Sequence, residues 1–108
     1  MTPEGKVKKE FIEKLKERFP GCLILRNDPT YIQGIPDLTV LYKKHWAAFE
    51  CKESANAPHR PNQDYYVQGM NEMSYASFVY PENMEDVLND LEQTFKRSSR
   101  RCSCISGS

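Results

Sequence analysis

Apolar side chains at the start of the chain have the spacing of one helix face. They recur every four residues, at Val7, Phe11, Leu15 and Phe19. Thr2 can cap this helix, Pro3 suits its first position, and Pro20-Gly21 ends it. We therefore predict an amphipathic helix over residues 3–19 with its apolar side turned to the core.

Short apolar runs further along the chain predict strands over residues 22–26, 37–42, 46–52 and 74–80. A turn at Lys44-His45 joins the two middle runs into a hairpin, and both faces of this hairpin are apolar, so we expect it to be covered on both sides. One helix is predicted from Pro61 or Asn62 to Met73, with Asn62 as its cap, and another from Asn83 onward. The order α-β-β-β-α-β-α predicts an α/β protein, a mixed sheet flanked by helices.

The length and composition favour one folded domain. The chain has 108 residues, of which 39% are hydrophobic. We predict a single domain over residues 1–95 and a flexible, basic Ser/Cys tail over residues 96–108. No apolar run reaches the length of a membrane span, so no membrane partner is expected and a cytosolic protein is the default. The four cysteines are then reduced, and Cys102 and Cys104 are too close for a usual zinc site.

The formal net charge is zero, but the charges are unevenly distributed. The first helix is crowded with basic residues and the last helix is acidic. The basic ones are Lys6, Lys8, Lys9, Lys14, Lys16 and Arg18, and the acidic ones are Glu82, Glu85, Asp86, Asp90 and Glu92. This distribution fits a basic face that binds a polyanion, with an acidic back, and it equally fits a solvated mixed surface.

The predicted hairpin carries the candidate chemistry. Asp37 begins its first strand, and Glu50 and Lys52 project from one face near the end of its second strand. If the strands pair across the turn, two carboxylates and one ammonium converge on a small patch. Hard divalent cations prefer such oxygen ligands, and a lysine beside the metal can hold a water. A plain ion pair of Lys52 with Glu50 or Asp37 is the structural alternative.

Pro36-Asp37 followed by Glu50-Cys51-Lys52 is similar to the signature of PD-(D/E)XK nucleases. The wider pattern resembles the virus-type replication-repair nucleases, the VRR-NUC group, over residues 2–95. Its components here are Glu4, Gly34-Ile35-Pro36-Asp37, Glu50-Cys51-Lys52 and Gln63. The resemblance implies a restriction-endonuclease-like core.

The same resemblance implies a divalent-metal-dependent DNA endonuclease. Asp37, Glu50 and the backbone carbonyl of Cys51 would bind Mg²⁺ or Mn²⁺, Lys52 would act on the attacking water, and Gln63 would hold Lys52. Small members of this group act on branched DNA such as Holliday junctions, which suggests a bacterial cell or a phage-infected host. A less selective flap- or end-trimming nuclease and a catalytically inactive DNA-binding subunit are the alternatives.

Several supporting roles remain open at this level. Glu4 is a further candidate metal ligand or simply a first-turn acid that complements the helix dipole, with Glu10 as the fallback. Gln63 is otherwise an exposed helix-start residue. Candidate DNA contacts are Arg26, Tyr31, His59 and Arg60. A homodimer is expected, because a four-way junction needs two matched cuts. Its interface, or otherwise the monomer's core, would contain Trp46, Tyr65, Tyr66, Met70 and Met73.

Overall fold

A computed structural model describes the backbone of residues 1–106 and the side chains of residues 1–97. The elements follow the order α1 (Pro3–Arg18), β1 (Leu23–Arg26), β2 (Leu38–Tyr42), β3 (His45–Cys51), α2 (Pro61–Met73), β4 (Ala76–Val79) and α3 (Met84–Ser106). The strands form one sheet in the order β1-β2-β3-β4. β1, β2 and β3 pair antiparallel, and β4 is parallel to β3. The predicted mixed sheet and element order are confirmed.

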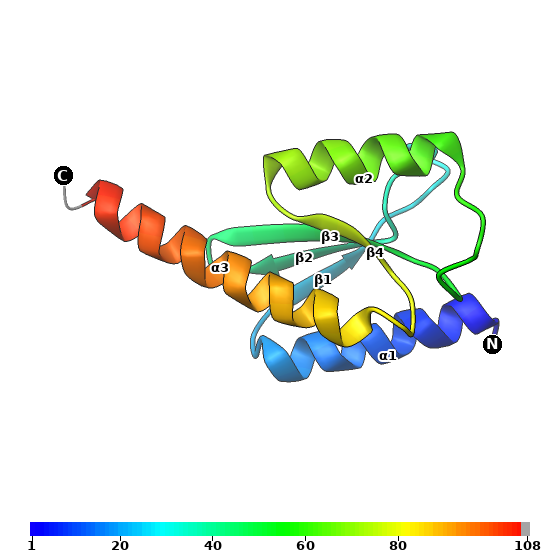
Figure 1. Ribbon diagram of the computed structural model, residues 1–108, viewed down its shortest axis with the longest axis horizontal. Coiled ribbons are helices and arrows are strands. Elements are labelled where there is room, and N and C mark those ends of the chain that lie inside the picture. The colour runs from blue at the N-terminus through cyan, green and yellow to red at the C-terminus, as the bar shows by residue number, and fades with distance from the viewer. Residues whose placement is uncertain (107–108) are drawn as a thin grey trace.

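The sheet lies between two helical layers, with α2 on one face and α1 and α3 on the other (Figure 1). The main core fills the space between the sheet and the α1/α3 layer, and it includes Phe11, Leu15, Val40, Phe49 and Leu91. A smaller cluster of Ala48, Val67 and Ala76 lies under α2. The second strand of the hairpin, β3, is therefore covered on both faces, as its apolar composition predicts, whereas β2 is covered only on the side of α1 and α3. α2 packs on β3 and β4, so it covers only part of its face.

The hairpin turn differs by one residue from the prediction. Tyr42 pairs with His45, so the turn consists of Lys43 and Lys44 rather than Lys44 and His45. Lys43 takes the left-handed conformation, with φ of 56°, that tight two-residue turns require. This register pairs Leu38 with Phe49 and therefore aligns the preceding residue, Asp37, with Glu50.

The helix ends follow local chemistry. Thr2 Oγ1 accepts a hydrogen bond from the backbone N–H of Gly5 at 3.0 Å and caps α1, as predicted. α2 begins at Pro61, so the capping position belongs to Arg60 and not to Asn62. The helical backbone of α3 continues past Phe95 to Ser106. The side chains of Cys102 and Cys104 lie outside the described residues, and the division at residue 95 stays a prediction.

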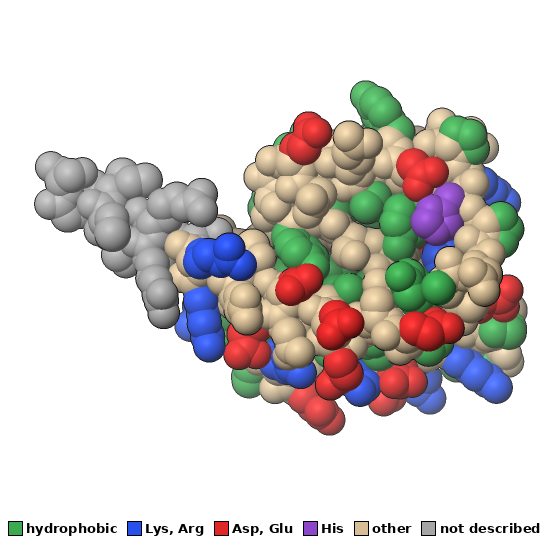
Figure 2. All heavy atoms as spheres, viewed as in Figure 1, with side chains coloured by type: hydrophobic (Ala, Val, Ile, Leu, Met, Phe, Trp, Pro, Cys, Tyr) green, Lys and Arg blue, Asp and Glu red, His purple; other side chains and the backbone are tan. Residues whose placement is uncertain are grey.

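Ion pairs join α1 to α3 on the side away from α2. Lys14 Nζ lies 3.2 Å from Glu85 Oε2, and Arg18 Nη1 lies 3.5 Å from Glu92 Oε1. Figure 2 shows acidic side chains gathered over α3 on the face in view. The acidic back therefore lies on α3 and neutralises the second half of α1. No helix in the described part of the chain has the length and apolar character needed to cross a membrane.

Candidate active site

Asp37 is held at the start of β2 by contacts on both sides. Asn27 donates its backbone N–H to the carbonyl of Asp37 at 2.7 Å and its side-chain amide to the carbonyl of Pro36 at 2.9 Å. The backbone N–H of Cys51 donates to Asp37 Oδ2 at 3.0 Å. Lys8 Nζ lies 3.6 Å from the other oxygen, Oδ1. One carboxylate oxygen is therefore fixed by the sheet, and the other faces a cation.

Gly34 brings the loop before β2 against the start of α2. Its φ of +91° favours glycine, and a Cβ at this position would lie 2.3 Å from Asn62 Cβ and 2.8 Å from the Asn62 carbonyl carbon. Only a glycine permits this approach, which brings the strand that carries Asp37 close to the helix turn that carries Gln63. The glycine of the Gly-Ile-Pro-Asp motif therefore has a packing role.

Glu50 is a buried acid at the end of β3. It is 3% exposed, and its Oε2 accepts a hydrogen bond from Gln63 Nε2 at 3.1 Å. Burial, followed by the charge of Asp37, raises the pKa of Glu50 from 4.5 to about 8, and the nearby charge of Lys52 partly opposes this rise. In the absence of a bound cation, this carboxyl therefore tends to hold its proton at neutral pH.

Lys52 is buried beside this acid without pairing to it. Its ammonium donates to Gln63 Oε1 at 2.7 Å and to the carbonyl of Pro58 at 3.2 Å. Among the described side chains Lys52 forms no ion pair with Glu50 or Asp37, so the plain ion pair considered from the sequence is absent. The three charged groups are arranged as separate functional groups around one patch.

Gln63 connects the charged groups from the first turn of α2. It accepts from Lys52 and from the backbone N–H of Arg60, the latter at 3.1 Å, and it donates to Glu50. Every one of these bonds fixes the orientation of its amide. The alternative of an exposed helix-start glutamine is therefore wrong, because the side chain is partly buried and fully engaged.

Three carboxylates from three different elements converge at this point. Oxygens of Glu4, Asp37 and Glu50 lie within 4.8 Å of one another. Glu10, the fallback, instead lies 3.9 Å from Lys14 on the surface of α1 and is 60% exposed. Such a set of oxygen donors fits a hard divalent cation such as Mg²⁺ or Mn²⁺, because a cation would relieve the repulsion between carboxylates that otherwise favours protonation of Glu50.

A cavity of about 520 Å³ opens over the carboxylates and is bounded by the start of α1, the loop before β2 and the loop before α2. Both His59 and Arg60 line it, as does Lys52. The His59 ring stacks on Phe78 with centroids 3.9 Å apart, and its Nδ1 lies 3.0 Å from Asp64 Oδ1. Arg26 and Tyr31 are exposed and do not line this cavity.

Two residues at this site are absent from the candidates that the sequence suggests. Asn27 fixes the strand start, and nothing in its polar loop distinguishes it beforehand. Lys8 faces Asp37, and a signal for it does exist: it follows Glu4 by four residues, which places both on one side of α1.

The chain shares its fold with a solved structure titled "VRR_NUC domain". The TM-score is 0.68 and the sequences are 22% identical, and the match covers 82% of this chain and 97% of that one. The sequence matches no protein-family model and no curated protein. The fold expected from the Pro-Asp and Glu-x-Lys motifs is therefore confirmed, and the carboxylates described above lie at those two motifs.

Proposed function

We propose that this chain is a metal-dependent nuclease that hydrolyses phosphodiester bonds within DNA. The observation that carries the proposal is the convergence of Glu4, Asp37 and Glu50 within 4.8 Å, with Lys52 held separately by Gln63 in the same cavity. The likeness to a VRR_NUC domain supports the same activity. Carboxylates and a lysine in this arrangement serve hydrolysis of a phosphodiester better than any purely structural role, because each buried charge is costly.

In the proposed mechanism, Asp37 and Glu50 would hold the metal, and the backbone carbonyl of Cys51 and the carboxylate of Glu4 would be further oxygen ligands. Bound Mg²⁺ or Mn²⁺ would neutralise phosphate charge and lower the pKa of a water. Lys52 keeps one ammonium proton free of Gln63 and Pro58, and this proton orients the water or stabilises the negative charge that develops on the phosphate. Gln63 keeps Lys52 and Glu50 in their relative positions.

We further propose that branched DNA is the substrate and that two copies act together. A four-way junction is resolved by paired cuts, and one chain offers one carboxylate cluster among its described residues. Two-fold symmetry would supply the second site. Such an enzyme would work in the cytoplasm of a bacterial cell or of a phage-infected host.

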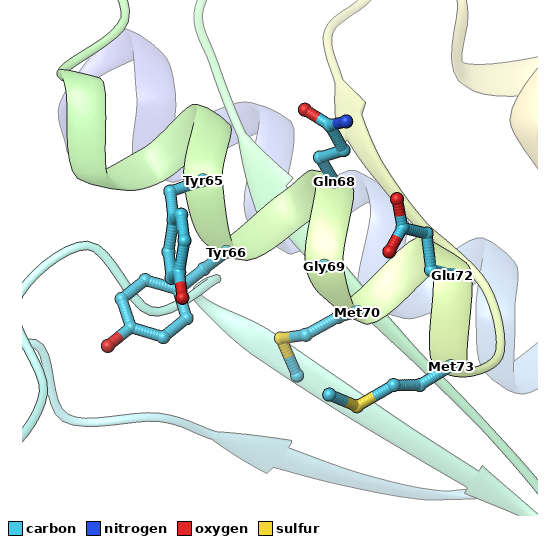
Figure 3. A pocket seen from close by; sticks show the side chains of 7 residues that line it. All are labelled: Tyr65, Tyr66, Gln68, Gly69, Met70, Glu72 and Met73. Carbon is cyan, nitrogen blue, oxygen red and sulfur yellow. The ribbon is translucent and has the colours of Figure 1, made fainter.

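An uncovered apolar surface beside α2 supports the homodimer. On β1 and β2, the face that α2 leaves open carries Leu23, Leu25 and Leu41, which are 57%, 42% and 37% exposed. Figure 3 shows Tyr65, Tyr66, Met70 and Met73 extending from α2 toward the strands, whereas Gln68 and Glu72 point away. A second copy would bury this surface, because monomers rarely leave a continuous apolar area in water.

The interface residues expected from the sequence divide into two groups, apart from Tyr66, which is half-buried. Trp46 and Met70 pack against the small cluster of Ala48, Val67 and Ala76, so they also serve the core of the monomer. Tyr65 and Met73 are 72% and 77% exposed, so the core does not account for them. These two exposed side chains are the stronger candidates for the interface.

Two alternatives remain. A less selective nuclease would trim flaps or ends with the same residues and would need no second copy. An inactive DNA-binding subunit of the same fold is less well supported, because Asp37, Glu50 and Lys52 are all present and grouped.

A cleavage assay on four-way junctions, flaps and linear duplexes, with Mg²⁺, with Mn²⁺ and with chelator, tests the proposal. We expect metal-dependent cleavage that is abolished by Asp37→Asn, Glu50→Gln and Lys52→Ala, and double variants no worse than single ones, because the three residues act as a unit. Asp86→Asn, a change at an exposed position on α3, is the matched control. Full activity of Asp37→Asn contradicts the assignment.

A further inference from the structure

The acidic cluster contains one cation that the proposed mechanism leaves unused. Lys8 Nζ lies 3.6 Å from Asp37 Oδ1, and the two side chains are 27% and 21% exposed. Lys52 is the other ammonium nearby, and it is committed to Gln63 and Pro58. Lys8 is therefore the group that balances Asp37 in the metal-free chain.

The position of Lys8 follows from the helix. Glu4 and Lys8 are separated by four residues, so both project from the same side of α1 toward the start of β2. The intervening Val7 is buried in the main core and anchors this turn. Glu4 and Lys8 thus reach Asp37 from one rigid helix. Glu4 brings a carboxylate to the cluster, and Lys8 brings an ammonium beside it.

The contact between Lys8 and Asp37 is a loose ion pair. At 3.6 Å it is an ion pair longer than an ordinary hydrogen bond, and Asp37 is the only ionic partner of Lys8 among the described residues. A divalent cation bound at Asp37 would bring a second positive charge close to this ammonium. The ammonium and such a cation would therefore compete for Asp37 Oδ1.

We propose that Lys8 couples metal binding to DNA binding: its ammonium neutralises Asp37 until a divalent cation binds there, and then contacts a phosphate of the DNA. This inference rests on the proposed nuclease function and adds a residue to it. A displaced ammonium on a flexible four-carbon stem can reach a neighbouring anion, and a DNA phosphate bound over the carboxylates would supply one. Since coupling is reciprocal, DNA raises the affinity for the metal as much as the metal raises the affinity for DNA.

Calorimetric titration with Ca²⁺, with and without a short DNA duplex, tests the coupling through binding and without turnover. Lys8→Met keeps an unbranched side chain of nearly the same length and removes the charge. We expect it to bind Ca²⁺ about tenfold more tightly than the unaltered chain when DNA is absent, because a like charge beside the site is gone. We also expect DNA to increase the Ca²⁺ affinity of the unaltered chain and to increase that of Lys8→Met much less.

Lys9→Met is the matched control, because it removes the same charge from the next position of α1, where the side chain is exposed. Its Ca²⁺ affinity should equal that of the unaltered chain. Thermal unfolding supplies a second readout: Lys8→Met should melt lower than the unaltered chain in chelator and gain more from Ca²⁺. Lys8→Gln, a polar replacement, repeats both measurements should Lys8→Met fold poorly.

Equal or weaker Ca²⁺ binding in the Lys8 variants overturns the coupling, because a purely structural Lys8 would lower the melting temperature and leave metal affinity alone. If DNA increases the Ca²⁺ affinity of the unaltered chain and of Lys8→Met by the same factor, the proposed phosphate contact is overturned. If the unaltered chain binds Ca²⁺ and DNA but the variants match it, only this inference fails. If the unaltered chain binds neither, the proposed nuclease function fails with it.

Discussion

Gln63 accepts a hydrogen bond from the ammonium of Lys52 at 2.7 Å, across eleven residues of chain and between two different elements. The same amide donates to Glu50, so the spacing between the lysine and the buried acid depends on one side chain of α2. Because that amide also accepts from the N–H of Arg60, the start of α2 and the geometry of the charged groups are fixed together.

Gln63→Ala should therefore reduce cleavage by about 10- to 100-fold, the usual effect of losing a group that orients an active residue, and less than loss of Asp37, Glu50 or Lys52. Single-turnover kinetics at saturating metal would measure the change. Gln68→Ala, at an exposed position on the same helix, is the control and should behave as the unaltered chain. Loss as complete as that of Lys52→Ala would make Gln63 a primary residue.

The metal-free chain should lose stability as the pH rises, because of Glu50. Its pKa is 4.5 ordinarily and about 8 in the folded chain, so between these values the folded state retains a proton that the unfolded state releases. The stabilisation is complete below the lower value and is lost as the pH passes the upper one. Glu50→Gln removes this dependence and should be the more stable chain at high pH.

Urea unfolding in chelator at about pH 5 and about pH 9 would measure that difference, with the unaltered chain and Glu50→Gln compared at each pH so that other titrating groups cancel. Asp86→Asn serves as the surface control. An identical pH dependence in the unaltered chain and Glu50→Gln would contradict the raised pKa.

Glu4 should contribute to metal affinity, whereas Glu10 should not. Glu4 lies with Asp37 and Glu50 in the cluster, and Glu10 lies beside Lys14 on the surface. We expect Glu4→Gln to weaken binding of Mn²⁺ about tenfold, a small effect for a ligand because two carboxylates remain. Calorimetry with Mn²⁺ and cleavage at limiting metal are the measurements. If Glu4→Gln binds Mn²⁺ as the unaltered chain does and Glu10→Gln binds it more weakly, Glu10 would be the metal ligand on α1.

Gly34→Ala should destabilise the fold and impair cleavage together. The new Cβ would clash with Asn62 and would also have to adopt a positive φ, which we expect to cost about 1–3 kcal/mol. Gly69→Ala is a favourable control, because it lies in α2 with no atom within 4 Å of the added Cβ, and it should stabilise the chain by about 0.5–1 kcal/mol. Chemical denaturation measures both.

Light scattering at micromolar concentration should report a dimer. A charge introduced into the uncovered apolar surface, as in Met73→Asp, should shift the mass toward the monomer, because the charge would be buried in the interface. Tyr31→Asp places the same charge at another exposed side chain, in the loop before β2, and should leave the mass unchanged. A clean monomer that cuts one strand of branched DNA would rule out paired cutting and favour flap trimming.

The sequence predicted most of the elements because helix and strand periodicity is local. The amphipathic spacing of Val7, Phe11 and Leu15 is sufficient to locate α1, and two motifs in strand context locate Asp37 and Glu50. The turn was wrong by one residue because Lys43, Lys44 and His45 are all polar residues that suit a turn, and only the pairing of Tyr42 with His45 shows which two form it.

The partners of the site residues were harder to predict, because they depend on how distant elements pack. Lys8 reaches Asp37 across twenty-nine positions of the sequence. Its spacing from Glu4 places both on one side of α1, but no local pattern records that this side meets the start of β2. The capping position of α2 belongs to Arg60 because Gln63 accepts its N–H while also binding Lys52, a tertiary contact that overrides the intrinsic preference for Asn62.

The ion pairs that join Lys14 and Arg18 to Glu85 and Glu92 would have a consequence for the proposed binding of DNA. They leave the second half of α1 with little net charge, so this part of the surface would displace few counterions from a duplex, and the affinity should fall only gently with salt. One protomer would then dissociate quickly from plain duplex DNA. Two linked protomers that both reach a strand at a junction would stay far longer, since the second contact forms within the complex. The low net charge of each chain would thereby favour binding to branched DNA over binding to plain duplex DNA.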